Sequence, residues 1–399
     1  MRIFMICELY DPSLEFQENQ LVRQYRRMGH EVMVVASTFD DVFDYYAGRY
    51  DPTKPASSFD DNGATIYHLP YRYNYLNKLR AYTDITDLLN GFSPDLIYIH
   101  DIMPNIPEIV RYRRRHPEVR IIMDIHMDAT NSGKNWLSRR ILHGVVRRWF
   151  LNRVRPHLDG IFPNYPHGFK FMRELYKVPD SEMTLLPLGC DTEFIDSVQR
   201  GQDREKARAA LGLGPDDFVI FTGGKLTARK KFEVLAEAID CPELAQAHVV
   251  VAGKVPDDDL DYRVVVERAC APIAERIHFM GWQKPEGMYR LMHIADVAVF
   301  TASQSVMWQG AIGSGLPLIV GDAGGQDPGY LNRNDNVTVL PPADVNVAGL
   351  RAALIALARD PERRRRMRAG ALKTAREHLD WSVLAARTLE PRGGAAAQE

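Results

Sequence analysis

Short apolar runs alternate with longer amphipathic segments along almost the whole chain. In the first half, apolar runs of strand length fall at residues 2–7, 31–37, 65–69, 96–100, 120–126 and 160–164. Amphipathic segments between them, at 18–28, 77–90 and 138–155, have the periodicity of helices. Strands of a parallel sheet are buried on both faces and therefore have continuous apolar runs, so the alternation predicts a doubly wound α/β sheet.

The second half repeats this pattern, with apolar runs at residues 218–222, 248–252, 277–280, 297–301, 316–320 and 337–340. Turn residues followed by polar sequence at 185–200 predict the joint between two domains. We expect two Rossmann-like domains, at residues 1–190 and 200–375. A C-terminal helix at 376–390 is expected to cross back to the first domain, and residues 391–399 to form a frayed tail.

Composition narrows the class of protein. The 399 residues, 45% hydrophobic and 26% charged, are typical of a globular protein with more than one domain, and a net charge of −2 offers no bulk attraction to nucleic acid. The four cysteines stand far apart, which argues against a disulfide framework or a zinc site and favours reduced thiols in the cytoplasm. The N-terminal apolar run is too short for a signal peptide.

The segment FVIFTGGKLTARKK at residues 218–231 carries the most specific chemistry. An apolar run breaks at Gly223 and Gly224, and Lys225 and Lys230 follow before a helical segment at 232–239. Backbone N–H groups and two ammonium groups would converge there, which suits a diphosphate. Taken by itself, the segment is more typical of an ordinary loop with solvated lysines, and the rest of the chain reverses that preference.

Polar residues also follow the predicted strands of the first domain, where ligands bind in open α/β sheets. They are Glu8, Asp11, His100, Asp101, Asp124, His126 and Asp128. A neutral histidine flanked by carboxylates can orient hydroxyl groups or move protons. Two other interpretations stay open: a structural histidine that caps a strand end, and a metal site, for which the Asp-x-His-x-Asp pattern lacks convincing partners.

The motifs, in their order, resemble the family 4 retaining glycosyltransferases of GT-B fold over nearly the whole chain. MGHEVMVVAS resembles the family's GHEV segment, LPLGCDTEFI its interdomain segment, and GGKLTARKKF its phosphate-binding segment. In the last of these, Lys225 stands at the family's arginine and Lys230 at its lysine. VVVAG, HFMGW, ADVAVFTAS, GSGLPLIVGDAGG and ARDPERRRRM follow in the family's order.

The resemblance implies a hexosyltransferase-like enzyme with parallel sheets facing across a cleft, an acceptor domain first and a donor domain second. The donor would be a nucleotide-diphosphate sugar and the acceptor a carbohydrate or lipid-linked carbohydrate. No metal or other cofactor is expected, because Lys225, Lys230 and the helix dipole would stabilise the leaving diphosphate. His126 matches a family histidine near the transferred sugar, which it would position without acting as a general base.

Two departures from the family pattern bear on the site. Ala302 and Gly310 stand where the family has a pair of glutamates that hold the donor. We expect polar substitutes nearby, with Gln309 reaching the nucleotide or its sugar. The predicted donor residues are Gly223, Gly224, Lys225, Lys230, Gly253, Ser303, Gln304 and Gln309.

The second departure is DPSLEFQENQ, at residues 11–20, in place of a glycine-rich loop. Its "QEN" resembles a bacterial surface-polysaccharide branch of the family. The implied acceptor-side residues are Glu15, Gln17, Glu18, Asn19, His100, Asp101 and Asp128. The other interpretation of this segment is a helix N-terminus in which acidic residues are simply favourable.

The segment at 111–155 is rich in arginine, and Leu142, Val145, Val146, Trp149 and Phe150 have helical spacing within it. A basic amphipathic helix with aromatic residues can lie on an anionic membrane, which would make the protein peripheral at the inner membrane face. The alternative is a core helix with solvated arginines. Two other functions also remain open: a nucleotide-sugar 2-epimerase, and a non-catalytic nucleotide-sugar-binding protein.

Overall fold

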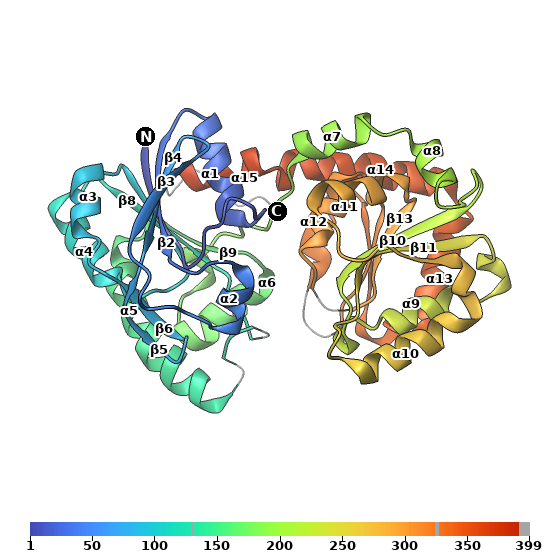
Figure 1. Ribbon diagram of the computed structural model, residues 1–399, viewed down its shortest axis with the longest axis horizontal. Helices are drawn as coiled ribbons and strands as arrows, with labels where there is room; N and C mark the ends of the chain where they lie inside the picture. The colour runs from blue at the N-terminus through green and yellow to red at the C-terminus, as the bar shows by residue number, and fades with distance from the viewer. Residues whose placement is uncertain (130, 134, 303, 324–326, 391–399) are drawn as a thin grey trace. The chain divides into compact units, whose positions relative to one another are not determined.

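The computed structural model describes residues 1–390 except Thr130, Lys134, Ser303 and 324–326. The chain forms two compact units, which we describe separately (Figure 1). Unit 1 comprises residues Met1–Pro187 together with the C-terminal segment from Leu384, and unit 2 comprises Leu188–Val383. Among the described residues, no helix is long and apolar enough to cross a membrane.

A seven-stranded sheet in the order β3-β4-β2-β1-β7-β8-β9 forms the centre of unit 1. Its strands are β1 Arg2–Ile6, β2 Glu31–Ser37, β3 Ser57–Asp61, β4 Ala64–Leu69, β7 Leu96–His100, β8 Arg120–Ile125 and β9 Gly160–Pro163. The pairing is parallel throughout except for β3 and β4, which are antiparallel. Because β1 lies between β2 and β7, the strand order reverses there, which is where such sheets bind ligands.

Helices cover both faces of this sheet (Figure 1). They are α1 Gln17–Arg27, α2 Val42–Ala47, α3 Thr86–Phe92, α4 Ile106–Arg115, the π-helix η1 Ser138–Arg147, α5 Arg148–Val154, α6 Pro166–Phe171 and the π-helix η3 Met172–Tyr176, with 3₁₀ turns η2 Arg155–His157 and η4 Asp180–Glu182. A separate antiparallel hairpin is formed by β5 Tyr71–Tyr75 and β6 Leu79–Tyr82. Apolar side chains of α3, α4 and α5, such as Leu89, Ile109 and Leu151, pack with Phe4 and Ile99 of the sheet.

Unit 2 is built on a six-stranded parallel sheet in the order β12-β11-β10-β13-β14-β15. Its strands are β10 Phe218–Lys225, β11 Ala247–Lys254, β12 Ile277–Phe279, β13 Val297–Phe300, β14 Leu318–Gly321 and β15 Val337–Leu340. Successive side chains of a strand point to opposite faces, and β10 shows this: Ile220 joins one apolar core and Phe221 the other. The strand order reverses at β10, between β11 and β13.

The helices of unit 2 are α7 Thr192–Arg200, α8 Arg204–Ala209, α9 Phe232–Ile239, α10 Leu260–Cys270, α11 Pro285–Ile294, α12 Met307–Gly313, α13 Val347–Ala358, α14 Pro361–Thr374 and the π-helix η10 Ala375–Leu379. Its 3₁₀ turns are η5 Ala228–Lys230, η6 Pro242–Leu244, η7 Ala271–Arg276, η8 Pro328–Leu331 and η9 Pro342–Asp344. Helices α9, α10 and α13 supply one core, and α11 and α12 supply the other.

The last helix, α15 Trp381–Leu389, begins in unit 2 and ends in unit 1. Within unit 1, the hydroxyl groups of Tyr25 and Thr388 lie 2.5 Å apart, and the guanidinium group of Arg120 donates to the carbonyl oxygens of Leu389 and Glu390 at 2.6 Å each. These contacts attach the end of the chain to α1 and to the beginning of β8.

The prediction of a helix at residues 77–90 was wrong for its first part. Residues 79–82 form β6, and a shorter helix, α3, follows. The side chain of Asn105 accepts a hydrogen bond from the backbone N–H of Tyr82 at 2.9 Å, and the Tyr82 ring stacks on that of Tyr71 with centroids 5.0 Å apart. Tertiary contacts therefore override the local helical periodicity here.

Candidate active site

The carboxyl ends of β10 and β11 approach each other closely in unit 2. Strand β10 continues through Gly223 and Gly224 and pairs with residues 252–254 of β11, so the predicted end at residue 222 is wrong. A Cβ atom at Gly223 would lie 2.6 Å from the carbonyl oxygen of Ala252, and one at Gly253 would overlap the carbonyl oxygen of Gly224. These glycines are therefore required by strand packing itself.

Lys230 differs from Lys225 in its surroundings. Lys230 ends η5 and lines a small pocket with Gly223, Thr301 and Ser305. Its side chain is largely buried, and burial lowers the pKa of its ammonium group. Within the described residues, no carboxylate forms an ion pair with it. Lys225 is exposed at the end of β10, so Lys230 is the cation that the fold directs into the pocket.

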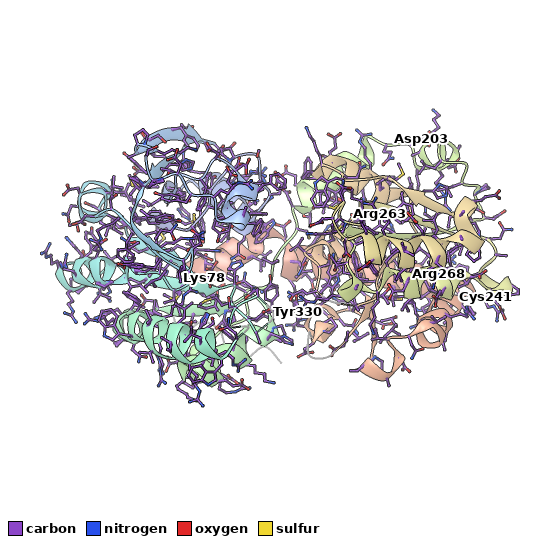
Figure 2. All side chains as sticks on the ribbon, turned by 60° about the horizontal axis from the view of Figure 1, so that its bottom comes forward. Lys78, Asp203, Cys241, Arg263, Arg268 and Tyr330 are labelled. Carbon is purple, nitrogen blue, oxygen red and sulfur yellow. The ribbon has the colours of Figure 1, made fainter. Side chains whose placement is uncertain are left out.

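Gln309 lies on α12, directly after the loop that follows β13. It is 1% exposed, its amide nitrogen lies 3.4 Å from the hydroxyl of Tyr330 (labelled in Figure 2), and its Oε1 atom has no hydrogen-bond partner among the described residues. An unpaired buried acceptor costs about 1–3 kcal/mol. Ser303 lies outside the described residues, and Gln304 is partly exposed nearby. Contact between Gln309 and a donor stays a prediction.

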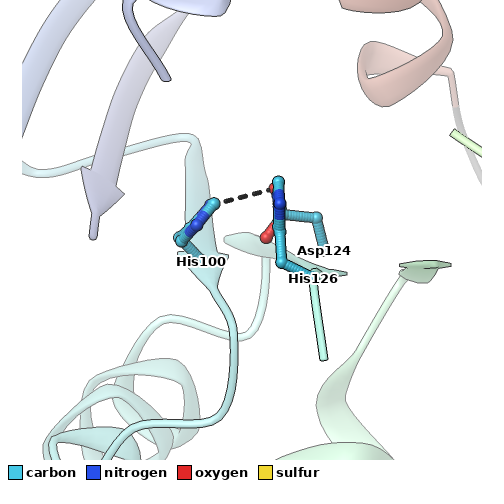
Figure 3. Close-up of side chains that lie close together, drawn as sticks. All are labelled: His100, Asp124 and His126. Atoms are coloured by element: carbon cyan, nitrogen blue, oxygen red, sulfur yellow. Dashed lines mark hydrogen bonds and ion pairs between the residues drawn. The ribbon is translucent and has the colours of Figure 1, made fainter. Parts of the chain in front are cut away.

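Asp124 is the centre of a hydrogen-bond network at the strand ends of unit 1 (Figure 3). The carboxylate is fully buried, and four groups surround its Oδ2 atom. The Tyr98 hydroxyl donates at 2.8 Å and the amide of Gln17 at 2.9 Å, while His100 Nδ1 lies at 3.1 Å and His126 Nε2 at 3.3 Å. Strands β7 and β8 and helix α1 therefore meet at a single carboxylate.

Two residues of the "QEN" segment, Gln17 and Glu18, belong to this network, and the third, Asn19, does not. Glu18 Oε1 lies 3.1 Å from His100 Nε2, and Gln17 accepts a hydrogen bond from the buried amide of Asn164. Asn19 instead donates to the carbonyl oxygen of Asp11 at 3.0 Å. Glu15 pairs with Arg23 at 2.7 Å and has no place in the network.

Electrostatics favour the charged forms of the two central groups. Burial by itself would lower the pKa of His100, but the carboxylates of Asp124 and Glu18 outweigh it and raise that pKa well above its ordinary value. Burial likewise opposes ionisation of Asp124, yet His100 and His126 hold its pKa below the ordinary range. With a carboxylate at each ring nitrogen, His100 is therefore an imidazolium that donates to both.

Two other predicted residues stabilise the loops around this network. Asp101 has a positive φ of 58° and accepts a hydrogen bond from the backbone N–H of His126 at 2.9 Å; burial raises the pKa of its carboxyl group. Asp128 is buried, and its side chain accepts from the backbone N–H of Asn131 at 3.0 Å, while the side chain of Asn131 accepts from the N–H of Asp128. Both aspartates shape the chain that carries His126.

The ligand atoms of His100, Asp124 and His126 all lie within 4.8 Å of one another, so this group could hold a metal ion. The same geometry arises when two ring N–H groups donate to one carboxylate. In that case the nitrogen lone pairs that would bind a metal are not directed at a common point. The expectation of metal-independent activity therefore stays a prediction.

Sequence reasoning missed two members of the network, Tyr98 and Asn164. A signal was present for each. Tyr98 stands two residues before His100, so both side chains lie on the same face of β7, and Asn164 directly follows β9 as His126 follows β8.

Comparison with known proteins gives each unit a family. A family model described as "Glycosyl transferase 4-like domain" matches residues 18–189, and one described as "Glycosyl transferases group 1" matches residues 203–374. The two matches together span most of the chain. The chain therefore belongs to the glycosyltransferases that combine these two domains.

Two curated relatives illustrate the range of the family. The lipopolysaccharide core biosynthesis glycosyltransferase LpsD of Rhizobium meliloti is 29% identical over 324 residues, which cover 79% of this chain and 80% of that protein. D-inositol 3-phosphate glycosyltransferase of Rhodococcus erythropolis is 28% identical over 241 residues and 58% of this chain. The chain matches about half of that second relative's length, 53%.

Among solved structures, HepE from Anabaena in complex with UDP aligns over 98% of both chains, with a TM-score of 0.69 and 14% identity. The same protein has also been solved with UDP-glucose. At this identity the similarity shows the fold alone, and it confirms the predicted GT-B class.

Proposed function

We propose that this glycosyltransferase moves a hexose, with retention of anomeric configuration, from a nucleotide-diphosphate sugar to a carbohydrate or lipid-linked carbohydrate acceptor. Polysaccharide or glycoconjugate biosynthesis is the setting that the relative LpsD supports. The complexes of HepE with UDP and UDP-glucose support the donor class. A lipid-linked acceptor would bring the protein, as a peripheral protein, from the cytoplasm to the inner face of a membrane.

The observation that carries this proposal is the largely buried ammonium group of Lys230. Removing a charge from water is costly unless an opposite charge compensates it, and none of the described residues supplies a carboxylate. A diphosphate at the pocket beside Gly223 would supply that charge through charge-assisted hydrogen bonds. Lys225, exposed at the end of β10, would add a second cation at the solvent side.

The N-terminus of α9 contributes less to this site than the sequence suggested. The backbone N–H of Phe232, the first residue of α9, already donates to the Tyr262 hydroxyl at 2.9 Å. Stabilisation of the leaving diphosphate would therefore fall mainly on the two lysines. In the transfer, the bond from the anomeric carbon to the diphosphate breaks and a bond to the acceptor oxygen forms on the same face. The acceptor proton would pass to a phosphate oxygen of the leaving group.

His126 would position the transferred sugar. Its Nε2 atom is directed at Asp124, while its Nδ1 atom has no hydrogen-bond partner among the described residues and its ring is partly exposed. Nδ1 is therefore the atom through which His126 would meet a sugar hydroxyl. The acceptor side would be completed by Gln17 and Glu18, which hold the other members of the network.

A chelator separates the metal-free mechanism from its alternative. We expect activity to survive EDTA, because the lysines supply the positive charge that a divalent ion would otherwise supply. If EDTA abolished activity and a divalent cation restored it, the group of His100, Asp124 and His126 would have to be reassigned as ligands.

A thermal-shift screen tests the proposed donor class. Ligands that bind the folded state raise the melting temperature in proportion to the logarithm of their concentration above Kd. We expect a nucleoside diphosphate and its sugar conjugate to stabilise the protein, and the monophosphate and the nucleoside to do so less. A screen in which no nucleoside diphosphate stabilises the protein would overturn the proposal.

A further inference from the structure

An apolar stripe lies on the exposed side of the helix that runs from η1 into α5 in unit 1. Leu137, Ile141, Val145 and Trp149 follow one another at intervals of four residues, and residues four apart lie on one side of a helix. Their exposed fractions are 59%, 49%, 61% and 48%. Phe150, Leu151 and Val154 do pack in the core, as the core-helix interpretation expects. The outer face, however, carries Val145 and Trp149 as well as arginines.

Arginines flank the stripe, and residues 138–154 contain no acidic residue. Arg140 and Arg153 are exposed, and the guanidinium group of Arg153 lies 4.0 Å from the centre of the Trp149 ring. Arg139 lies 3.9 Å from Glu174, at the limit of an ion pair. This combination of an apolar line, an aromatic residue and flanking cations is typical of helices that lie in a membrane interface.

Arg147 contacts other parts of unit 1 through its guanidinium group. Its guanidinium group donates to the carbonyl oxygen of Lys78 at 2.9 Å and contacts the sulfur of Met127. It thereby fastens the turn of the β5–β6 hairpin beside the helix; Lys78 is labelled in Figure 2. Leu76, in that turn, is 90% exposed and has a positive φ of 52°, so neither packing nor backbone preference explains a leucine there.

We propose that this helix face is a docking surface for an anionic phospholipid bilayer. Ile141, Val145 and Trp149 enter the interfacial region, and Arg140 and Arg153 bind lipid phosphates. The charge of the surface selects this occupant, because a helix with several arginines and no acidic residue of its own complements an anionic bilayer. This surface rests on the proposed function, because it would bring the protein to the membrane that holds a lipid-linked acceptor.

Vesicle sedimentation tests the surface without any sugar donor. Vesicles of phosphatidylcholine with phosphatidylglycerol are compared with vesicles of phosphatidylcholine alone, at low and high salt. We expect binding only to the anionic vesicles, and weaker binding at high salt because surface charges are screened within about 10 Å at 0.1 M. Arg140→Glu with Arg153→Glu, and separately Ile141→Ser with Trp149→Ser, should each weaken binding roughly tenfold or more.

Matched controls come from unit 2. Val264→Ser with Val265→Ser changes two apolar residues of similar exposure on α10, at 54% and 44%, and should leave vesicle binding unchanged. Absence of binding to anionic vesicles at low salt would overturn the proposal, as would equal binding by the helix variants. The protein could instead fail to bind vesicles and self-associate in a concentration-dependent way that the same variants abolish. That result would assign the face to a second copy of the chain. Sugar transfer by the variants to a soluble acceptor is measured separately. This activity tests the proposed function, whereas vesicle binding tests the docking surface.

Discussion

The two candidate sites lie at equivalent places in two similar sheets, yet they are built in opposite ways. In unit 1, Asp124 is surrounded by donors, and His100 has a carboxylate at each ring nitrogen. In unit 2, Lys230 is partly buried and the Oε1 atom of Gln309 is fully buried, and neither has such a partner among the described residues. In the first site the central carboxylate and the His100 ring are satisfied, although the Oδ1 atom of Asn164 has no partner among the described residues. The centre of this site is therefore held in place before any ligand binds, whereas the polar groups of the second site would be satisfied by a bound ligand.

This difference predicts opposite consequences for stability and binding. A change in the network of unit 1 should destabilise the protein, because it leaves buried groups without partners. A change in the pocket of unit 2 should leave the fold intact and weaken binding.

Asp124→Asn should have the largest effect on the free energy of unfolding. Removing one partner of a buried ion pair costs about 3–5 kcal/mol, and Asp124 is shared by two histidines. Urea unfolding measures this loss, with the same slope m of unfolding free energy against urea concentration used for both proteins. The matched control is Asp128→Asn, a buried carboxylate four residues along that lies outside the network. Equal losses in the two variants would contradict the central place of Asp124.

Lys230→Ala should weaken donor use without destabilising the fold. A hydrogen bond to a charged group contributes about 1.5–3 kcal/mol, so kcat/KM for the donor should fall by roughly one to two orders of magnitude. Melting temperature without ligand should stay the same or rise, because a buried unpaired charge is removed. Lys225→Ala should have a smaller effect in the same direction.

Lys254→Ala is the control for both lysine variants, since Lys254 lies at the adjacent strand end but pairs with Asp257 at 2.7 Å. It should leave donor use unchanged. Wild-type nucleotide affinity in the Lys230 variant would show that the phosphate site lies elsewhere.

The pH dependence of stability tests the environment of His100. Its pKa is raised above 6.5 in the folded protein, so the stabilisation is fully present below that value and is lost as the pH rises through the raised pKa. Glu18→Gln removes one of the two attracting carboxylates and should move this loss to lower pH. Glu31→Gln, at an exposed pair with Arg2, should not. Asp124 acts in the opposite direction: its stabilisation is lost as the pH falls below 3.8.

Gln309→Ala should have the smallest of these effects. If Gln309 holds the nucleotide or its sugar, the donor's KM should rise roughly tenfold, consistent with about 1.4 kcal/mol for a neutral hydrogen bond. Tyr330→Phe removes the hydroxyl group that lies 3.4 Å from the amide nitrogen of Gln309, and it should change KM less. A donor complex with no Gln309 atom near the nucleotide would contradict the prediction.

The strands of both sheets could be predicted from the sequence because buried parallel strands have continuous apolar runs. Strand β3, with the sequence SSFDD, has no such run and is stabilised by its antiparallel partner, so no local pattern indicates it. The same holds for β6, which is stabilised by contacts of Tyr82 with two residues outside the segment, the hydrogen bond to Asn105 and the stacking on Tyr71.

The candidate sites could be predicted in part for a related reason. His100 is the last residue of β7, and His126 and Lys230 come shortly after β8 and β10. Strand ends are recognisable in the sequence. The contact of Gln17 with Asp124 joins residues that are 107 positions apart, and the register of α1 against the sheet decides it. Whether a lysine is buried or exposed likewise depends on packing, and for this reason the sequence did not separate Lys230 from Lys225.

Turnover of a nucleotide sugar, measured with and without acceptor, distinguishes a transferase from an epimerase and from a binding protein. We expect that nucleoside diphosphate is released, that release depends on a carbohydrate or lipid-linked acceptor, and that the glycosidic bond of the product keeps the configuration of the donor. Release at the same rate without acceptor, together with an epimerised sugar, would instead indicate a 2-epimerase. Tight binding of the nucleotide sugar with no turnover under either condition would contradict the account and leave a non-catalytic binding protein.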